Sequence, residues 1–363
     1  MNTQAPLLQV QGLKVHFTSK EGTVKAIDGL SFEVYPEEVL GIVGESGCGK
    51  SVTALSILNV LSRNARIVDG TILFRRGAET IDIARLDPDG EAMRAIQGKE
   101  IAMIFQEPMT AFSPLHTIGD QIGEMIELHL LPAAPADGQP SGARPGTAPP
   151  PKPGVLNRPA VRRWVDEQTS AILGKVGMPN PEEILHAYPH NLSGGMRQRA
   201  MIAMGLSCNP QILIADEPTT ALDVTLQAQV LRLMKQMQAD YHMAIIFITH
   251  DLGVIAEMAD RVVVMYLGRV AETAAVDDLF HQPRHPYTQA LIRSVPKTSG
   301  PLEKLIPIEG TVPSPMDMPP GCKFHTRCPQ AIPGRCDVRE PELIPVAAGH
   351  AVACWLYADG AAA

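Results

Sequence analysis

The sequence predicts an α/β fold built on a buried, mostly parallel sheet, and two observations carry this prediction. First, continuous apolar runs of strand length alternate with segments of helical spacing, as is typical of parallel strands buried on both faces. The apolar runs lie at 211–216, 244–249 and 261–266, and the helical segments at 224–239 and 251–258. Second, a strand, a glycine-rich loop and a helix follow one another between residues 39 and 60.

The earlier part of the chain, residues 7–43, alternates apolar stretches with short polar turns and is expected to form successive strands. These stretches are LLQVQGLKVHF, TVKAI, LSFEV and EVLGIVG. Helical spacing begins at Ser51 and returns between about 115 and 190. An interruption at 132–159 is dominated by Pro, Ala and Gly, which predicts a flexible surface insertion.

The overall composition excludes several classes of protein. Hydrophobic residues make up 45% of the chain and charged residues 19%, and no apolar run is long enough to span a bilayer. The N-terminal MNTQAPLLQVQG lacks the basic and apolar stretches of a secretory signal. The net charge of -8 and the pI of about 5.8 argue against binding to a nucleic-acid backbone. We therefore expect a cytoplasmic protein with no nucleic-acid partner.

The glycine-rich loop fits the pattern G-x-x-x-x-G-K-[ST] of a phosphate-binding loop. Its glycines let consecutive N–H groups turn toward phosphate oxygens, Lys50 supplies a positive charge to the β and γ phosphates, and Ser51 offers a hydroxyl to Mg²⁺. Its place between a strand and a helix favours this function over a turn without function. The expected nucleotide-binding residues of the loop are Gly44, Glu45, Ser46, Gly47, Cys48, Gly49, Lys50 and Ser51.

Two adjacent carboxylates end the apolar run at 211–216. Asp216, at the carboxyl end of the expected strand, is placed to hold Mg²⁺ through water, and Glu217 can polarise an attacking water as a general base. Adjacent acids in an exposed turn are usually only solvated charge. The buried strand before them and the phosphate loop elsewhere favour the catalytic interpretation.

The segment Leu192-Ser193-Gly194-Gly195-Met196 resembles the LSGGQ signature of ABC ATPases, with Met196 in place of Gln. Ser193 can cap a helix that begins at the glycines, so its hydroxyl and the positive helix end suit a γ-phosphate. The resemblance implies an ABC-type P-loop ATPase with a RecA-like core and an N-terminal antiparallel β-subdomain. It also implies a helical subdomain, at about 108–205, that carries the signature.

Other residues match the same family. The resemblance implies that Gln106 in MIFQEP is the Q-loop glutamine and binds Mg²⁺ together with Ser51 and Asp216. It also implies that Asp223 belongs to the D-loop and that His250 in FITHD is the switch histidine. ATP and Mg²⁺ are thus the expected cofactors.

Phe17 in LKVHF stands where the family places an aromatic side chain that stacks on adenine, although a lone Phe in a strand is more often part of a core. In this family the signature of one subunit completes the site begun by the phosphate loop of another. A second ATPase subunit is therefore an expected partner, and a monomer should be a poor ATPase.

Longer segments resemble the ATPases of dipeptide and oligopeptide importers: MIFQEPMTAFSP, AYPHNLSGGMRQR, IADEPTTALDVT and the tail segment PRHPYTQALIRSVP. The first favours the D-type subunit over its F-type partner. The resemblance divides the chain into an ATPase domain at 7–270 and a transporter tail at 271–363. It implies an F-type ATPase subunit, two membrane permeases and a periplasmic solute-binding protein as partners, at the cytoplasmic face of the inner membrane.

Two alternatives stay open. ATPases of nickel and glutathione importers share the same pattern. A soluble ABC ATPase that acts on ribosomes or DNA is a different class, which usually carries two cassettes or a long coiled-coil insertion. The sequence contains neither feature.

Four of the six cysteines lie in the tail: Cys322, Cys328, Cys336 and Cys354. In a reducing compartment such clustering favours a metal over disulfides, but the C-x-x-C pairs of structural zinc sites are absent from the sequence. The tail resembles that of peptide-importer ATPases, some of which carry a [4Fe–4S] cluster, and four thiolates are its usual ligands. We favour such a cluster, which would staple the tail, over zinc or four unligated thiols.

Overall fold

The structure is a computed structural model that describes residues 5–20, 22–106, 111–131, 158–220, 222–295 and 307–358. The chain divides into two compact units. The first unit combines residues 1–88 with 246–363, and the second consists of residues 89–245. The two units are described separately below.

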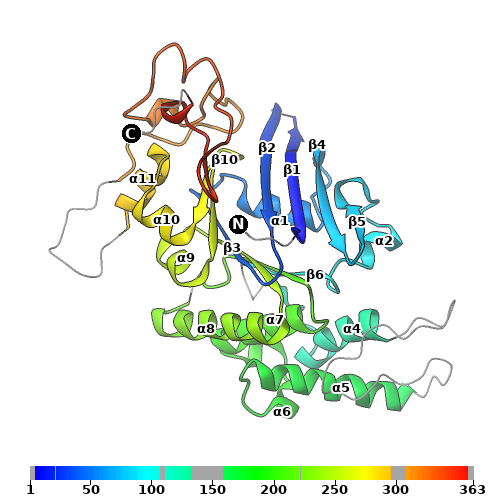
Figure 1. Cartoon of the computed structure of the whole chain (residues 1–363). Helices are drawn as coiled ribbons and strands as arrows, with labels where there is room; N and C mark the ends of the chain where they lie inside the picture. The colour runs from blue at the N-terminus through cyan, green and yellow to red at the C-terminus, as the bar shows by residue number, and fades with distance from the viewer. Residues whose placement is uncertain are drawn as a thin grey trace. The chain divides into compact units, whose positions relative to one another are not determined.

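A four-stranded antiparallel sheet forms the N-terminal part of the first unit (Figure 1). In the order β2-β1-β4-β5, its strands are β2 (Gly22–Val34), β1 (Leu8–Ser19), β4 (Ala65–Arg76) and β5 (Glu79–Asp82). The two strands expected at TVKAI and LSFEV form the single strand β2. The register between β1 and β2 shifts next to Gly12, whose φ of +57° permits a bulge. This sheet confirms the expected antiparallel β-subdomain.

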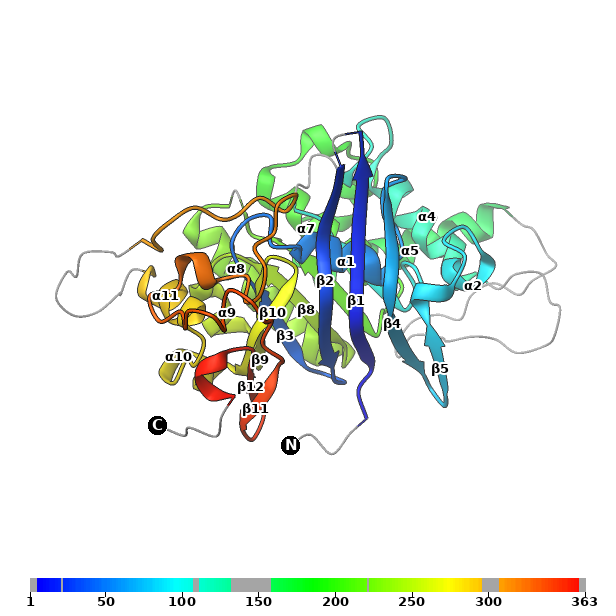
Figure 2. The same cartoon turned by 90° about the horizontal axis from the view of Figure 1, so that it is seen from above.

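A second sheet of the first unit runs in the order β11-β12-β10-β9-β3-β8. Its strands are β3 (Val39–Val43), β8 (Ala244–Thr249), β9 (Arg261–Tyr266), β10 (Arg269–Ala275), β11 (Ile344–Ala347) and β12 (His350–Val352). Strands β3 and β9 are parallel, and all of β3 is buried, as predicted for an apolar strand covered on both faces. The short C-terminal strands β11 and β12 extend the sheet beyond β10 (Figure 2).

Helices of the first unit follow the phosphate loop and the later strands. They are α1 (Lys50–Ile57), α9 (Leu252–Met258), α10 (Val276–His281) and α11 (Pro286–Arg293), with short 3₁₀ turns η1 (Ile83–Arg85), η3 (His325–Arg327) and η4 (Trp355–Tyr357). Helix α9 packs closely on β3, because a Cβ at Gly41 would lie 2.8 Å from the Ile255 side chain. The predicted helices after Ser51 and at 251–258 are thus confirmed.

The C-terminal tail packs on the first unit through its own aromatic and apolar side chains. The Phe324 ring is 2% exposed and lies 5.3 Å, between centroids, from both Tyr266 and Tyr287. Val352 of β12 is completely buried. The expectation that the tail is too poor in apolar residues to fold without a metal staple is therefore wrong. Its core residues are few but widely spaced along the chain, and partners from β9 and α11 complete their burial.

The second unit contains a pair of parallel strands and a group of helices. The strands are β6 (Ile101–Ile104) and β7 (Ile212–Asp216), and the helices are α2 (Glu91–Arg94), α4 (Ile118–Leu130), α5 (Arg158–Lys175), α6 (Pro181–Leu185), α7 (Gly194–Leu206) and α8 (Val224–Tyr241), with the 3₁₀ turn η2 (Pro189–Asn191). Residues Ile101 and Ile212 pair in register. The helical interpretation of 115–190 and 224–239 is confirmed.

Helices α4 and α5 lie side by side in the second unit (Figure 1). Gly123 of α4 lets them approach, because a Cβ there would lie 2.9 Å from the Val165 side chain of α5. Of the predicted insertion at 132–159, residues 132–157 lie outside the described residues. Arg158 and Pro159 begin α5 instead of ending the insertion. Among the helices that the structure describes, none is long and apolar enough to span a membrane.

Candidate functional site

The glycine-rich loop connects β3 to α1 in the first unit, as the sequence predicts. Its two ends pass very close to other backbone atoms. A Cβ at Gly44 would lie 2.2 Å from the carbonyl oxygen of Met265, and one at Gly49, where φ is +103°, would lie 2.6 Å from that of Ala26. Larger residues are excluded at both positions, so the glycines fix where the loop lies on the strands beneath it.

Lys50 opens α1 and is 6% exposed. Its ammonium group donates to the carbonyl oxygens of Gly44, at 2.8 Å, and Glu45, at 3.2 Å. A buried ammonium requires such acceptors, and phosphate oxygens present the same acceptor chemistry. The loop therefore holds a positive charge against its own backbone at the start of a helix, where anions are favoured.

Cys48 in the middle of the loop is buried and faces protein. Its carbonyl oxygen accepts a hydrogen bond of 2.9 Å from the N–H of Gly268, in the turn between β9 and β10. Burial raises the pKa of the Cys48 thiol. The thiol is therefore protonated at neutral pH, which agrees with the expectation that Cys48 has no redox role.

The carboxylates that follow β7 are held in a defined arrangement in the second unit. Asp216 ends β7 and is 5% exposed. Glu217 follows with φ of +48°, a left-handed conformation that is costly for a non-glycine residue. Its carboxylate accepts hydrogen bonds from the Gln106 amide at 2.9 Å and the Thr220 hydroxyl at 3.0 Å. Thus Gln106 and Glu217, both predicted site residues, are in contact.

The signature segment begins α7 as predicted. The hydroxyl oxygen of Ser193 accepts from the N–H of Met196 at 3.3 Å and caps the helix at Gly194. A Cβ at Gly195 would lie 2.8 Å from the side chain of Leu226 in α8. The glycine therefore lets the signature approach α8 closely.

Asp223 caps the start of α8 by accepting from the N–H of Leu226 at 2.9 Å. Its neighbour Ala221 in the predicted D-loop lies outside the described residues. Gln198, which the sequence interpretation does not single out, donates at 2.6 Å to the carbonyl oxygen of Pro218 and is 1% exposed. It ties the signature helix to the turn after Glu217. Its position one helical turn beyond Gly194 on the same helix was the available signal.

The two remaining predicted site residues lie in the first unit. His250 directly follows β8 and is exposed, and the next residue, Asp251, caps α9 through the N–H of Gly253 at 2.8 Å. Phe17 lies near the end of β1, where it pairs with Val24 of β2 and is half-buried. Its partial exposure is compatible with either a core or a stacking role.

The four tail cysteines are brought into one neighbourhood, although they span residues 322–354. The N–H of Cys322 donates to the carbonyl oxygen of Cys336 at 2.8 Å. Burial, with smaller contributions from the other thiols, raises the pKa of Cys322 to about 11 and that of Cys354 to about 12. Burial also raises the pKa of Cys328. The thiols are therefore protonated at neutral pH in this arrangement.

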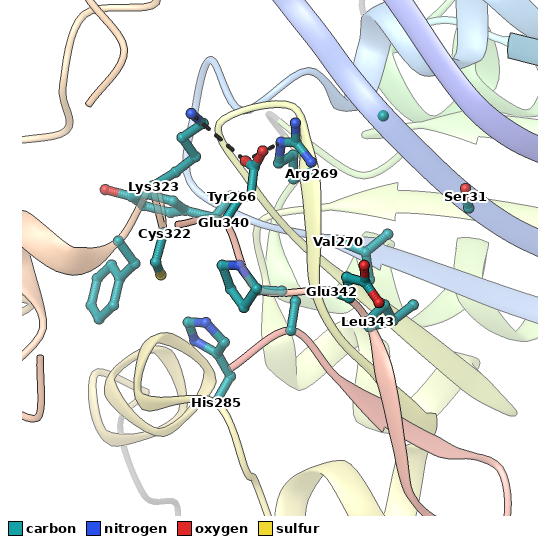
Figure 3. Close-up of a pocket in the computed structure, with 15 residues that line it drawn as sticks. Ser31, Tyr266, Arg269, Val270, His285, Cys322, Lys323, Glu340, Glu342 and Leu343 are labelled. Atoms are coloured by element: carbon teal, nitrogen blue, oxygen red, sulfur yellow. Dashed lines mark ion pairs between the residues drawn. The ribbon is translucent and has the colours of Figure 1, made fainter. Parts of the chain in front are cut away.

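A metal centre at these cysteines is not preformed. Within the described parts of the chain, no group of three or more His, Cys, Asp or Glu side chains is arranged to hold a metal ion. Cys322 instead lines a pocket of about 460 Å³ together with Tyr266 and His285 (Figure 3). At the mouth of this pocket Arg269 and Lys323 form ion pairs with Glu340, at 2.6 Å and 3.7 Å.

Comparisons with known proteins agree with this geometry. Residues 27–220 match the family model described as ABC transporter, and residues 271–336 match that described as oligopeptide/dipeptide transporter, C-terminal region. The oligopeptide transport ATP-binding protein AppD of Bacillus subtilis is 44% identical over 354 residues, which cover 97% of each chain. The dipeptide transport ATP-binding protein DppD of Escherichia coli is 41% identical over 355 residues, which cover 98% of each chain.

Solved structures share the fold. A dimeric post-hydrolysis structure of the ATP-binding cassette MJ0796, bound to ADP and Pi, superposes with a TM-score of 0.57 at 20% identity and covers 74% of this chain and 98% of that one. cbiO1 from Clostridium perfringens, part of the ABC transporter complex cbiONQ, gives a TM-score of 0.57 at 24% identity, over 77% and 92% of the two chains. At these identities the likeness supports the fold alone.

Proposed function

Since this chain belongs to the ABC transporter family, we propose that it is the ATP-hydrolysing subunit that powers an importer of dipeptides, oligopeptides or related small solutes. The observation that carries the proposal is the extent of the similarity. Relatives named for oligopeptide and dipeptide transport match 97% and 98% of the chain, including the tail as well as the nucleotide motifs. A match to the tail is informative because the tail contains none of the nucleotide motifs.

Residues 44–51 bind the phosphates of ATP in this proposal. Support comes from the closely packed glycines and from Lys50, whose ammonium already lies against backbone acceptors inside the loop. Ser51, Gln106 and Asp216 supply the hydroxyl, amide and carboxylate oxygens that Mg²⁺ prefers. Mg²⁺, when bound, supplies charge that neutralises the phosphates.

Glu217 is the general base, and Gln106 orients it. The hydrogen bonds from Gln106 and Thr220 hold the carboxylate in one orientation, which favours withdrawal of a proton from a water placed in line with the γ-phosphate. His250 contacts the γ-phosphate from the end of β8. Phe17 stacks on adenine, which its partial exposure permits.

The signature residues Ser193, Gly194, Gly195 and Met196 bind the γ-phosphate of ATP held by a partner ATPase subunit, and Asp223 contacts the same partner. The cap formed by Ser193 supports this role because it leaves the first N–H groups of α7 directed outward from a positive helix end. Two ATPs then join two subunits, and loss of the γ-phosphates releases them.

The partners that complete the proposed importer are an F-type ATPase subunit, two transmembrane permeases and a periplasmic solute-binding protein. The ATPase lies peripherally on the cytoplasmic face of the inner membrane. Reconstituted permeases with this subunit should take up a labelled dipeptide only when ATP is present, and Lys50→Ala should abolish uptake. Uptake independent of this subunit, or co-purification with ribosomes and without permeases, would refute the proposal.

We infer further that the four tail cysteines bind a [4Fe–4S] cluster. Their gathering around Cys322 supports this assignment, but the four thiols must deprotonate and turn toward a common centre, since no metal-binding arrangement is preformed among the described residues. Anaerobically purified protein should be brown, with about four iron and four sulfide per chain, and Cys328→Ser should lose both. Colourless protein with zinc, or with no metal, would refute this assignment.

A further inference from the structure

A salt bridge joins the C-terminal tail to the phosphate loop within the first unit. The Arg327 guanidinium donates two hydrogen bonds to the Glu45 carboxylate, with 2.7 Å from Nη1 to Oε2 and 3.1 Å from Nη2 to Oε1. The side chain of Arg327 is 3% exposed and that of Glu45 is 24% exposed. A two-pronged pair with a buried arginine is stronger and more specific in geometry than an exposed ion pair, because solvent screens it little.

The tail holds Arg327 in place from the other side. Arg327 ends the turn η3, where its N–H donates to the carbonyl oxygen of Phe324 at 2.9 Å, and its Nε donates to that of Glu309 at 3.0 Å. The N–H of His325 in the same turn donates to the carbonyl oxygen of Cys322 at 3.0 Å. The segment that carries Cys322, Cys328 and Cys336 therefore determines where the guanidinium lies.

Glu45 is fixed in the loop by more than this salt bridge. Its N–H donates to the hydroxyl oxygen of Tyr287 at 2.9 Å, and its carbonyl oxygen accepts from the Lys50 ammonium at 3.2 Å. The peptide groups that receive Lys50 are thus the ones that Arg327 and Tyr287 orient. Without Arg327, the Glu45 carboxylate would be an uncompensated negative charge beside the residues proposed to receive phosphates.

We propose that Arg327 is a positioning residue for nucleotide binding, through which the fold of the cysteine-bearing segment 322–336 sets the affinity of the phosphate loop for ATP. Arg327 both cancels the charge of Glu45 and fixes the orientation of its peptide groups. The inference rests on the proposed role of residues 44–51. Coupling of this kind is reciprocal, so bound ATP must also stabilise segment 322–336.

The test compares the dissociation constant of ATP for the full-length protein and its variants by calorimetry. Arg327→Met keeps the length and apolar contacts of the side chain but removes the charge, and it should weaken ATP binding about tenfold. Adding Glu45→Gln to Arg327→Met should recover most of this loss, because the unpaired carboxylate is then gone. A merely structural role for Arg327 would give no such recovery. Unchanged affinity in Arg327→Met, or no recovery in the double variant, overturns the proposal.

Two control variants separate this proposal from the function on which it rests. Arg335→Met removes an arginine of the same segment that lies over the Trp355 ring, 4.5 Å from its centroid, and should leave ATP affinity unchanged. Lys50→Ala should abolish binding, and if it binds ATP normally, the phosphate-loop assignment itself is wrong. Should Arg327→Met fail to fold, Arg327→Lys keeps the charge but only one prong, and an unaltered affinity there counts against the proposal.

Hydrogen exchange provides the reciprocal measurement. Addition of ATP should slow amide exchange across residues 322–336 in the wild-type protein and in Arg335→Met, but not in Arg327→Met. Because the readout is local to the tail, a general change in stability does not mimic it. Identical protection by ATP in wild type and Arg327→Met would overturn the coupling.

Discussion

The side-chain amide of Gln106 donates a hydrogen bond to the carboxylate of Glu217, with 2.9 Å between Nε2 and Oε2, although 111 positions separate the two residues. Gln106 follows β6 and Glu217 follows β7, and these strands are parallel neighbours. Their carboxyl ends therefore meet at one edge of the sheet. This contact holds the proposed catalytic base to one orientation and leads to the first prediction.

Glu217→Gln should bind ATP with nearly wild-type affinity but hydrolyse it at least about a hundredfold more slowly, because the amide cannot accept a proton from water. The variant should accumulate as an ATP-bound dimer. Steady-state hydrolysis in the assembled importer and size-exclusion chromatography with ATP provide the measurements. Thr220→Val, which removes only one hydrogen bond to the carboxylate, should cost much less. Wild-type turnover by Glu217→Gln would show that the base lies elsewhere.

His250→Ala should abolish hydrolysis coupled to uptake and leave ATP binding nearly unchanged, because the side chain is proposed to contact the γ-phosphate only in the closed dimer. His281→Ala, at an exposed position in α10, is the matched control and should transport normally. Dipeptide uptake by reconstituted vesicles measures both. Normal uptake by His250→Ala would favour a role limited to the start of α9.

Glu272→Gln should destabilise the first unit by about 2–4 kcal/mol. The completely buried carboxylate accepts hydrogen bonds from the N–H groups of Arg284 and His285, at 2.7 and 2.8 Å, and lies 2.7 Å from His350 Nε2. An amide would turn a donor toward one of these groups. Urea unfolding should show the loss, whereas Glu257→Gln, at an exposed position in α9, should change stability little.

Stability should fall as the pH drops from 6.5 to 5, because of His285. Burial lowers the pKa of this side chain to about 4, although the nearby Glu272 carboxylate opposes the shift. The unfolded chain, with an ordinary pKa near 6.5, binds a proton in this interval that the folded protein does not. The contribution is therefore complete above pH 6.5, and about 2 kcal/mol of it is lost by pH 5.

His285→Asn is the control for this pH dependence. Its side-chain oxygen can still accept from the N–H of Tyr287, as His285 Nδ1 does at 3.0 Å, so the cap of α11 is kept while the titrating group is removed. Urea unfolding at several pH values should show a flatter profile for the variant over this interval. An equal slope in both proteins would assign the pH dependence to other groups.

The sequence by itself determined the elements that depend on local pattern. Apolar runs such as 212–216 and 261–266 can be buried only as sheet strands, and the glycines at 44 and 49 are required wherever a strand turns tightly into a helix. The cap formed by Ser193 is likewise a matter of three residues. Local geometry alone fixes each of these features, so their positions could be read from the sequence.

Only the tertiary structure decided which distant residues meet. Nothing in the spacing of Arg327 and Glu45, 282 positions apart, predicts their salt bridge, because it depends on the tail docking beside β9 and α11. The merging of two expected strands into β2 and the pairing of β12 with β10 depend in the same way on long-range partners. Such contacts are set by how buried surfaces fit together, a property of the folded chain that no short stretch of sequence contains.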